Sequence, residues 1–212
     1  MRILIIAATE TELMPLLPDS VASTHTFDTL ATGVGLLSSA ISLMKKIHTQ
    51  KPDLAIQTGI AGSLVDTLPI GEAVVVKTER IGDLGVSESG SFASIFKMGL
   101  ADPDANPFVS GGLTNHHEQL LSLTGLQIVD AVSVNEISTN PTRIQHYHKN
   151  LGASIESMEG AAFHQVCLEF SIPFVQIRSI SNMAGVRDKS QWNIPLAIAS
   201  STHAVKNLIG KI

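Results

Sequence analysis

Apolar residues occur along the chain in short runs that have the length and the β-branched content of strands. Between these runs, apolar residues recur every three or four positions, as they do on one face of a helix. The runs that predict strands are residues 3–8, 54–57, 73–76, 126–129, 155–158 and 174–180. The stretches that predict helices are residues 36–47, 142–151, 160–170 and 196–212.

The alternation of strands and helices predicts an α/β protein with a mostly parallel or mixed sheet, because parallel strands need crossover connections. The length of 212 residues most simply gives one domain, residues 1–212. The least regular stretch is residues 82–114, and a loop of that length usually has a function or covers an active site.

The composition indicates a large buried interior and argues against nucleic-acid binding. Hydrophobic residues make up 44% of the chain and charged residues 16%, so much of it is interior or buried between subunits. The net charge is −5, and no basic run is longer than Lys45-Lys46, whereas a nucleic-acid-binding protein needs a basic patch.

The N-terminal apolar run is too short for a signal peptide or a membrane span, so we expect a cytoplasmic protein. Cys167 is the single cysteine and is expected to be a small buried residue.

Polar side chains follow three of the predicted strands. Glu10 and Glu12 follow the first strand, Glu159 stands beside Met158 where a strand turns into a helix, and Asn182 ends another strand. A carboxylate accepts two hydrogen bonds from a sugar diol, and an amide can bind the edge of a base. Ligands of such sheets bind beyond the carboxyl ends of the strands, so the pattern predicts a nucleoside site with its own general base. The helix dipole alone also favours acidic residues at helix starts.

Other motifs are weaker. Residues 58–63 contain two glycines, which let the backbone approach a ligand or simply make a tight turn. Residues 33–35 begin like a dinucleotide fingerprint, but its third glycine is missing and the acidic ribose contact is in the wrong place. The pairs His116-His117 and His146/His148 lack the spacing of metal ligands, so we expect neither a metal nor a cofactor.

Glu12, the turn with Gly59 and Gly62, Glu159 and Asn182 occur in an order that resembles the purine nucleosidase/phosphorylase superfamily over essentially the whole chain. Within it the chain is most similar to the futalosine hydrolases, relatives of the methylthioadenosine/S-adenosylhomocysteine nucleosidases. The resemblance implies a mixed, partly barrel-like central sheet surrounded by helices, commonly in a homodimer. It also implies hydrolysis of the N-glycosidic bond of futalosine in menaquinone biosynthesis, which releases hypoxanthine and dehypoxanthine futalosine.

The resemblance also implies roles for single residues. Glu12 matches the acid that activates the attacking water, and Glu159 matches the carboxylate that binds the ribose 2′ and 3′ hydroxyls. Met158 matches a methionine that packs against the sugar, and Asn182 falls where adenine-specific nucleosidases carry Asp. Further positions expected to contact the substrate are Gly59, Ile60 and Val134.

Asn182 indicates which purine the site accepts. An Asp donates to purine N7 only when it is protonated, while its other oxygen accepts from the amino group of adenine. A 6-oxopurine has acceptors at N7 and at position 6, and an amide NH₂ donates to both without any change of pKa. Asn182 therefore favours hypoxanthine or guanine over adenine, and futalosine carries hypoxanthine.

Further departures from the family pattern concern phosphate and the second carboxylate. Phosphorylases often have Arg-x-Gly-Ser where this chain has residues 57–60, Gln-Thr-Gly-Ile, so the cation and the hydroxyl that would hold phosphate are absent there. That difference favours hydrolysis. The Glu-Met-Glu of the nucleosidases is here Ser157-Met158-Glu159, so one of their two carboxylates is replaced.

Candidate contacts for the base ring and the 5′ arm lie outside these motifs. No residue in 132–136 corresponds clearly to the aromatic that stacks on the base, and Phe92 and Phe96 are candidates. Arg187 and Lys189 are candidates to bind the benzoate of the futalosine 5′ arm, but a charge pair on an exposed loop would look the same.

Three alternatives remain open. An adenine-directed nucleosidase would act on methylthioadenosine, S-adenosylhomocysteine or aminofutalosine. A phosphorylase would require phosphate. A catalytically inactive nucleoside-binding protein would share the fold, although the presence of both Glu12 and Glu159 argues against it.

Overall fold

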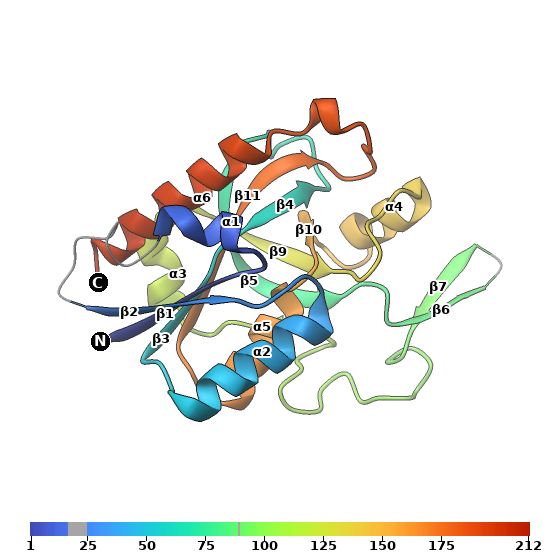
Figure 1. The fold of residues 1–212 in the computed structure, drawn as a ribbon. Coiled ribbons are helices and arrows are strands. Elements are labelled where there is room, and N and C mark those ends of the chain that lie inside the picture. The colour runs from blue at the N-terminus through green and yellow to red at the C-terminus, as the bar shows by residue number, and fades with distance from the viewer. Residues whose placement is uncertain (17–24, 89) are drawn as a thin grey trace.

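The computed structural model describes residues 1–16, 25–88 and 90–212 of the chain. Within these residues the main sheet has nine strands in the order β2-β1-β3-β11-β4-β10-β9-β5-β8 (Figure 1). In chain order they are β1 (Arg2–Ala7), β2 (Thr26–Ala31), β3 (Leu54–Gln57), β4 (Ile60–Ser63), β5 (Ala73–Ile81), β8 (Leu113–Thr114), β9 (Gln127–Ser133), β10 (Ile155–Ser157) and β11 (Phe174–Met183). Strands β6 (Gly85–Glu88) and β7 (Ser91–Ser94) form a separate hairpin.

Strand β11 closes part of the sheet into a barrel. Its first residues pair with β3, its central residues pair antiparallel with β5, and its last residues pair parallel with β4. Because β4, β10, β9 and β5 are successive neighbours, the two pairings of β11 complete a ring of five strands. The predicted mixed, partly barrel-like sheet is therefore confirmed.

Helices cover both faces of the sheet (Figure 1). Side chains of β1 alternate between the faces: Ile3 and Ile5 pack with residues of α6, whereas Leu4 and Ile6 pack with residues of α2 and α5. Burial on both faces is typical of a strand in the parallel part of a sheet. The helices are α1 (Glu10–Leu13), α2 (Leu36–Thr49), α3 (Glu118–Thr124), α4 (Pro141–Lys149), α5 (Gly160–Glu169) and α6 (Ile194–Ile209).

The topology brings several strand ends to one place. Ile6 near the end of β1 pairs with Gln57 at the end of β3. Ile60 at the start of β4 pairs with Ser179 in β11, and β10 runs antiparallel beside β4. The turns that follow β1, β3 and β10 therefore meet beside the second half of β11, as the sequence predicts for a ligand site.

The six predicted strands and four predicted helices are present, with shifted ends. Strands β5 and β9 continue beyond their apolar runs because polar residues of the two strands bond to each other inside the barrel, as Ser133 does with Glu79. The apolar pattern does not predict β2, β8 or α3. It places β4 in a turn, because that strand is short and contains a glycine. The irregular stretch 82–114 holds the β6–β7 hairpin.

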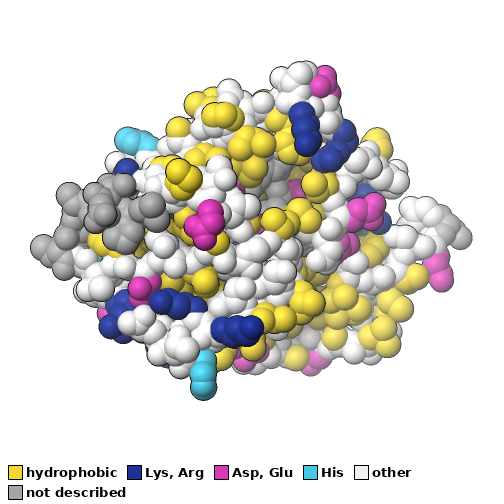
Figure 2. Space-filling view, in the orientation of Figure 1, with side chains coloured by type: hydrophobic (Ala, Val, Ile, Leu, Met, Phe, Trp, Pro, Cys, Tyr) yellow, Lys and Arg dark blue, Asp and Glu magenta, His cyan; other side chains and the backbone are white. Residues whose placement is uncertain are grey.

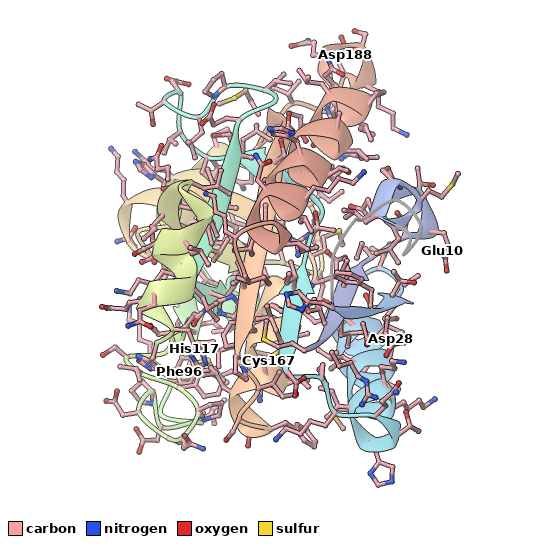
Figure 3. All side chains as sticks on the ribbon, turned by 90° about the vertical axis from the view of Figure 1, so that its left-hand side faces the viewer. Glu10, Asp28, Phe96, His117, Cys167 and Asp188 are labelled. Atoms are coloured by element: carbon pink, nitrogen blue, oxygen red, sulfur yellow. The ribbon has the colours of Figure 1, made fainter. Side chains whose placement is uncertain are left out.

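The structure bears on two further expectations, which concern the burial of Cys167 and membrane-spanning helices. Cys167 is buried in α5, where burial raises the pKa of its thiol (Figure 3). No helix in the described part of the chain is long and apolar enough to cross a membrane. The homodimer and the cytoplasmic location remain predictions.

Candidate active site

A cavity of about 330 Å³ lies where the strand ends meet. Figure 2 shows this face hollowed between hydrophobic side chains. The walls come from the β1–α1 turn, β4, β10, the end of β11 and the start of α6. Five of the predicted site residues line it, namely Glu12, Ile60, Met158, Glu159 and Asn182.

Glu12 caps the start of α1 and also lines the cavity. Its Oε2 accepts hydrogen bonds from the backbone N–H and the hydroxyl of Thr9, at 3.0 and 2.7 Å, so Glu12 completes a capping box at the start of α1. Its Oε1 accepts from the N–H of Ile60 at 3.3 Å on the cavity wall. Glu10 lies on the same short helix but is exposed and points away from the molecule (Figure 3).

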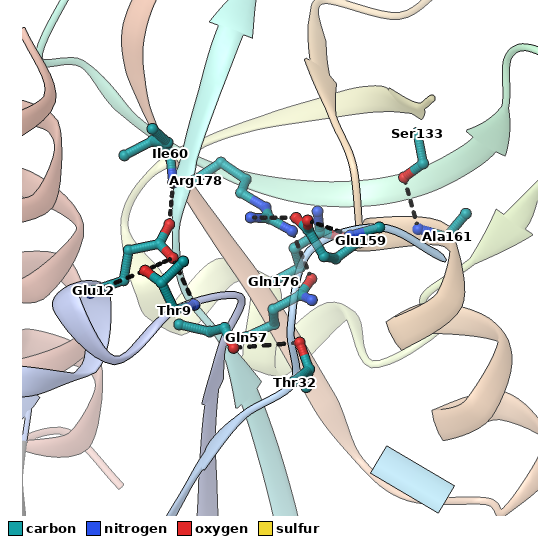
Figure 4. A network of polar contacts seen from close by, with 12 residues as sticks. Thr9, Glu12, Thr32, Gln57, Ile60, Ser133, Glu159, Ala161, Gln176 and Arg178 are labelled. Carbon is teal, nitrogen blue, oxygen red and sulfur yellow. Dashed lines mark hydrogen bonds and ion pairs between the residues drawn. The ribbon is translucent and has the colours of Figure 1, made fainter. Parts of the chain in front are cut away.

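Glu159 is a buried carboxylate held between a backbone donor and a buried cation. Its Oε1 accepts from the N–H of Gly35 at 3.0 Å, and its Oε2 lies 3.8 Å from Nη1 of Arg178 (Figure 4). The glycine turn at residues 33–35, which imitates a dinucleotide motif in the sequence, therefore holds this side chain. Arg178 is only 1% exposed, and no motif in the sequence predicts a role for it.

Gly59 allows Arg178 and Glu12 to approach each other. A Cβ atom at Gly59 would lie 2.5 Å from Nη1 of Arg178 and 3.0 Å from Oε1 of Glu12. The other amino group of the guanidinium, Nη2, donates to Oε1 of Gln57 at 2.9 Å. One buried cation thus lies beside two carboxylates, which reduces the electrostatic repulsion between them.

A second buried network fixes the start of α5, directly after Glu159. Glu79 accepts from Nε2 of Gln176 at 2.8 Å and from the hydroxyl of Ser133 at 3.0 Å. The same Ser133 oxygen accepts from the N–H of Ala161 at 2.8 Å (Figure 4). Burial raises the pKa of the Glu79 carboxyl to about 7, although the hydrogen bond from Gln176 and the charge of Arg178 oppose the rise.

The amide of Asn182 has a fixed orientation. Its Nδ2 donates to the carbonyl of Met183 at 3.0 Å, and its Oδ1 accepts from the hydroxyl of Ser181 at 2.7 Å. A flipped amide would place its oxygen against the Met183 carbonyl, which cannot donate. Because an NH₂ group has two hydrogens, this orientation leaves one N–H of Asn182 for a ligand in the cavity.

Other residues named from the sequence lie elsewhere. Val134 packs in a core cluster with Tyr147 and does not line the cavity. The guanidinium of Arg187 is 5.5 Å from the ring of Trp192, a cavity residue that follows the turn Lys189–Gln191. The two candidate stacking residues are also outside the cavity, since Phe92 contacts His146 and Phe96 contacts Phe108.

No motif in the sequence predicts that Ile137 and Glu156 line the cavity. Ile137 supplies apolar wall, as Trp192 does, and Glu156 supplies a third carboxylate. Glu156 stands within the motif that contains Glu159, but its position in a strand of three residues gave no periodicity from which to predict its face. The described residues contain no group of three or more His, Cys, Asp or Glu side chains that could hold a metal ion.

Comparison with known protein families identifies the family to which the chain belongs. Residues 2–210 match the family described as the phosphorylase superfamily. The chain belongs to the phosphorylase superfamily. This finding confirms the resemblance inferred from Glu12, Gly59, Glu159 and Asn182.

Two relatives within the phosphorylase superfamily are similar in sequence. A futalosine hydrolase from Thermus thermophilus is 31% identical over 184 residues, which cover 86% of this chain and 80% of that protein. A 5′-methylthioadenosine/S-adenosylhomocysteine nucleosidase from Staphylococcus aureus is 26% identical over 85% of this chain and 80% of that protein.

Solved structures confirm the phosphorylase-superfamily fold. Futalosine hydrolase from Helicobacter pylori superimposes with a TM-score of 0.83 and 19% identity, over 100% of this chain and 98% of that chain. A mutant of the H. pylori nucleosidase, with 5′-methylthioadenosine in its active site, gives a TM-score of 0.85 and 19% identity, over 100% and 99%.

We expect the Glu79→Gln substitution to change how the free energy of unfolding depends on pH. The pKa of Glu79 rises from 4.5 to about 7 on folding, so the folded protein binds this proton more tightly than the unfolded chain. Its contribution to stability is complete below the unfolded pKa and is lost as the pH rises through the folded pKa, a loss of roughly 3 kcal/mol. Urea unfolding between pH 4 and 8, a range of about four units, should show the wild type losing stability relative to the variant.

The matched control is Glu169→Gln, at the exposed end of α5. Its free energy of unfolding should follow the wild type at every pH, because the Glu169 side chain is exposed in the folded protein, as it is in the unfolded chain. Parallel pH curves for the wild type and the Glu79→Gln variant would show that Glu79 is not held in its neutral form.

Proposed function

We propose that this member of the phosphorylase superfamily hydrolyses the N-glycosidic bond of futalosine and releases hypoxanthine. The observation that carries the proposal is one cavity with a carboxylate, Glu12, beside Arg178, and an amide, Asn182, on the wall formed by β11. The similarity to a relative named futalosine hydrolase supports the same substrate.

Glu12 is the proposed general base. Its two oxygens accept three hydrogen bonds from Thr9 and Ile60, and a carboxylate has about four lone-pair sites, so one remains for a water molecule. The water attacks C1′ of the ribose as its proton passes to Glu12, and the electron pair of the C1′–N9 bond moves into the purine. The proton then moves from Glu12 to the departing base, which leaves as neutral hypoxanthine.

Glu159 and Met158 are the proposed sugar contacts. The Arg178 guanidinium and the N–H of Gly35 hold the Glu159 carboxylate in place, which prepares it to accept from the 2′ and 3′ hydroxyls. Met158 adds an apolar surface beside it. Asn182 donates its remaining N–H to the purine, where negative charge develops as the bond breaks.

The surroundings of Arg178 favour water over phosphate as the nucleophile. The guanidinium already contacts Glu159 and Gln57, and the Glu12 carboxylate lies next to it. A phosphate at this point would meet two carboxylates and one cation whose charge is already balanced.

The direct test is to incubate the purified protein with futalosine, aminofutalosine, methylthioadenosine and inosine, and to measure released base by chromatography. We expect hypoxanthine from futalosine without phosphate, and no increase in rate when phosphate is added. Release of adenine alone would favour an adenine-directed nucleosidase. A requirement for phosphate would identify a phosphorylase, and binding without release would identify a catalytically inactive protein.

The Glu12→Gln substitution should lower kcat for futalosine by roughly 10²–10⁴-fold, because the amide cannot take a proton from water. A glutamine also completes a capping box, so α1 should stay folded and the melting temperature should change little.

Glu10→Gln is the matched control, since Glu10 lies in the same helix turn but points into solvent (Figure 3). Its kcat should equal that of the wild type. Near-normal turnover by the folded Glu12→Gln variant would exclude Glu12 as the base.

Arg187 is proposed to bind the benzoate of the futalosine 5′ arm. Its guanidinium lies against Trp192, and this ring lines the cavity. The Arg187→Ala substitution should lower kcat/KM for futalosine by roughly 10–100-fold, the effect of losing a hydrogen bond between charged groups. Inosine has no benzoate and serves as the internal control. An equal loss for both substrates would contradict this role.

A further inference from the structure

The carboxylate of Glu159 does not cap the helix that it precedes. Glu159 is the N-cap residue of α5, and its side chain accepts no hydrogen bond from the first turn of that helix. A side chain at this position normally accepts from the backbone N–H two or three residues later. Both oxygens of Glu159 have other partners instead, since Oε1 accepts from the N–H of Gly35 and Oε2 lies 3.8 Å from Nη1 of Arg178.

The side chain of Ser133 supplies the cap from a different part of the chain. Its Oγ accepts from the N–H of Ala161, the second residue of α5, at 2.8 Å (Figure 4). Ser133 is the last residue of β9 and pairs with Ser157 of β10, so the sheet brings its hydroxyl beside the turn from β10 into α5. The N–H of Ala161 is therefore satisfied without the side chain of Glu159.

Glu79 holds the Ser133 hydroxyl in this place. Oε2 of Glu79 accepts from Ser133 at 3.0 Å, and Oε1 accepts from Nε2 of Gln176 at 2.8 Å. All three side chains are 0% exposed, so bulk water does not compete for these hydrogen bonds. Gly160 allows the Glu79 carboxyl to pack against the backbone of the first turn of α5, because a Cβ atom at position 160 would overlap Oε1 of Glu79.

Without the Ser133 hydroxyl, the start of α5 would compete with the cavity for Glu159. A free N–H in the first turn and the positive end of the helix dipole both attract a carboxylate. The contacts that hold Glu159 in the cavity are one hydrogen bond from Gly35, at 3.0 Å, and the 3.8 Å ion pair with Arg178. The backbone of Glu159 has φ −128° and ψ −16°, whereas a residue whose side chain caps a helix is typically extended. The present conformation of Glu159 thus belongs to a helix that another residue caps.

We infer that Ser133, held by Glu79, is a positioning residue that caps α5 in place of Glu159 and thereby leaves the Glu159 carboxylate to the cavity. The inference deepens the proposed function and rests on it for the ligand that Glu159 receives, the 2′ and 3′ hydroxyls of ribose. Loss of the Ser133 hydroxyl should turn Glu159 back onto its own helix.

The first test is the crystal structure of the Ser133→Ala variant. We expect an oxygen of Glu159 within hydrogen-bond distance of the N–H of Ala161 and no longer bonded to the N–H of Gly35. Ser133→Cys is a second variant, which keeps a side chain of similar shape but carries sulfur, a weak acceptor, and it should show the same movement.

The matched control is Ser122→Ala, at an exposed position of α3, which should leave Glu159 bonded to Gly35. A Glu159 side chain that keeps its contact with Gly35 in the Ser133→Ala variant would overturn the inference. The same observation in Ser133→Cys decides the matter if Ser133→Ala does not fold.

The second test measures whether the movement changes ligand binding. Calorimetry gives the dissociation constants of inosine and of 2′,3′-dideoxyinosine, which lacks both hydroxyls, in proteins that also carry Glu12→Gln so that hydrolysis is slow. Addition of Ser133→Ala should lower the preference for inosine at least about fivefold, the effect expected when a helix cap competes for the carboxylate. A general folding defect would weaken both nucleosides alike and leave their ratio unchanged.

The conservative Glu79→Gln variant tests whether hydrogen bonding or charge at position 79 matters. Its amide can accept from Gln176 and donate to Ser133, so the preference for inosine should stay as in the parent protein. A fall as large as that of Ser133→Ala would show that the charge of Glu79 controls Glu159, and it would overturn the inference.

The structural and binding measurements separate this inference from the proposed function. A Glu159 side chain that moves onto Ala161 without any change in the preference for inosine would keep the inference and contradict the proposed contact of Glu159 with the sugar. A Glu159 side chain that stays in place, in a protein that hydrolyses futalosine, would contradict the inference and keep the proposed function.

Discussion

The arrangement of the site depends on the ion pair between Arg178 and Glu159 inside the protein. Removing either charge from water is costly, and the cost is offset only when partners surround both groups. Gly35 and Gln57 supply those partners, and Gly59 leaves the space that the guanidinium occupies. Because Arg178 is part of β11, the strand that closes the barrel also places the cation beside Glu159, a residue of the cavity wall.

The sequence predicted the fold class because the apolar runs are strong local signals. Every residue in the run 54–57 is buried, and the run has the same first and last residues as β3. The closure of the barrel was implied by resemblance and could not be derived from these runs. It requires β11 to pair with β3, β5 and β4 along one strand, with a register shift between Ile180 and Asn182, and no local pattern encodes such pairings.

Local sequence signals predict some of the site residues, whereas others reach the cavity only through contacts between distant parts of the chain. Glu12, Glu159 and Asn182 could be found because each follows or ends a strand, where polar side chains in an otherwise apolar stretch stand out. Val134 also follows a strand, but its side chain faces the core cluster around Tyr147. Trp192 and Ile137 reach the cavity from irregular segments, and the position of such segments depends on the packing of the whole molecule.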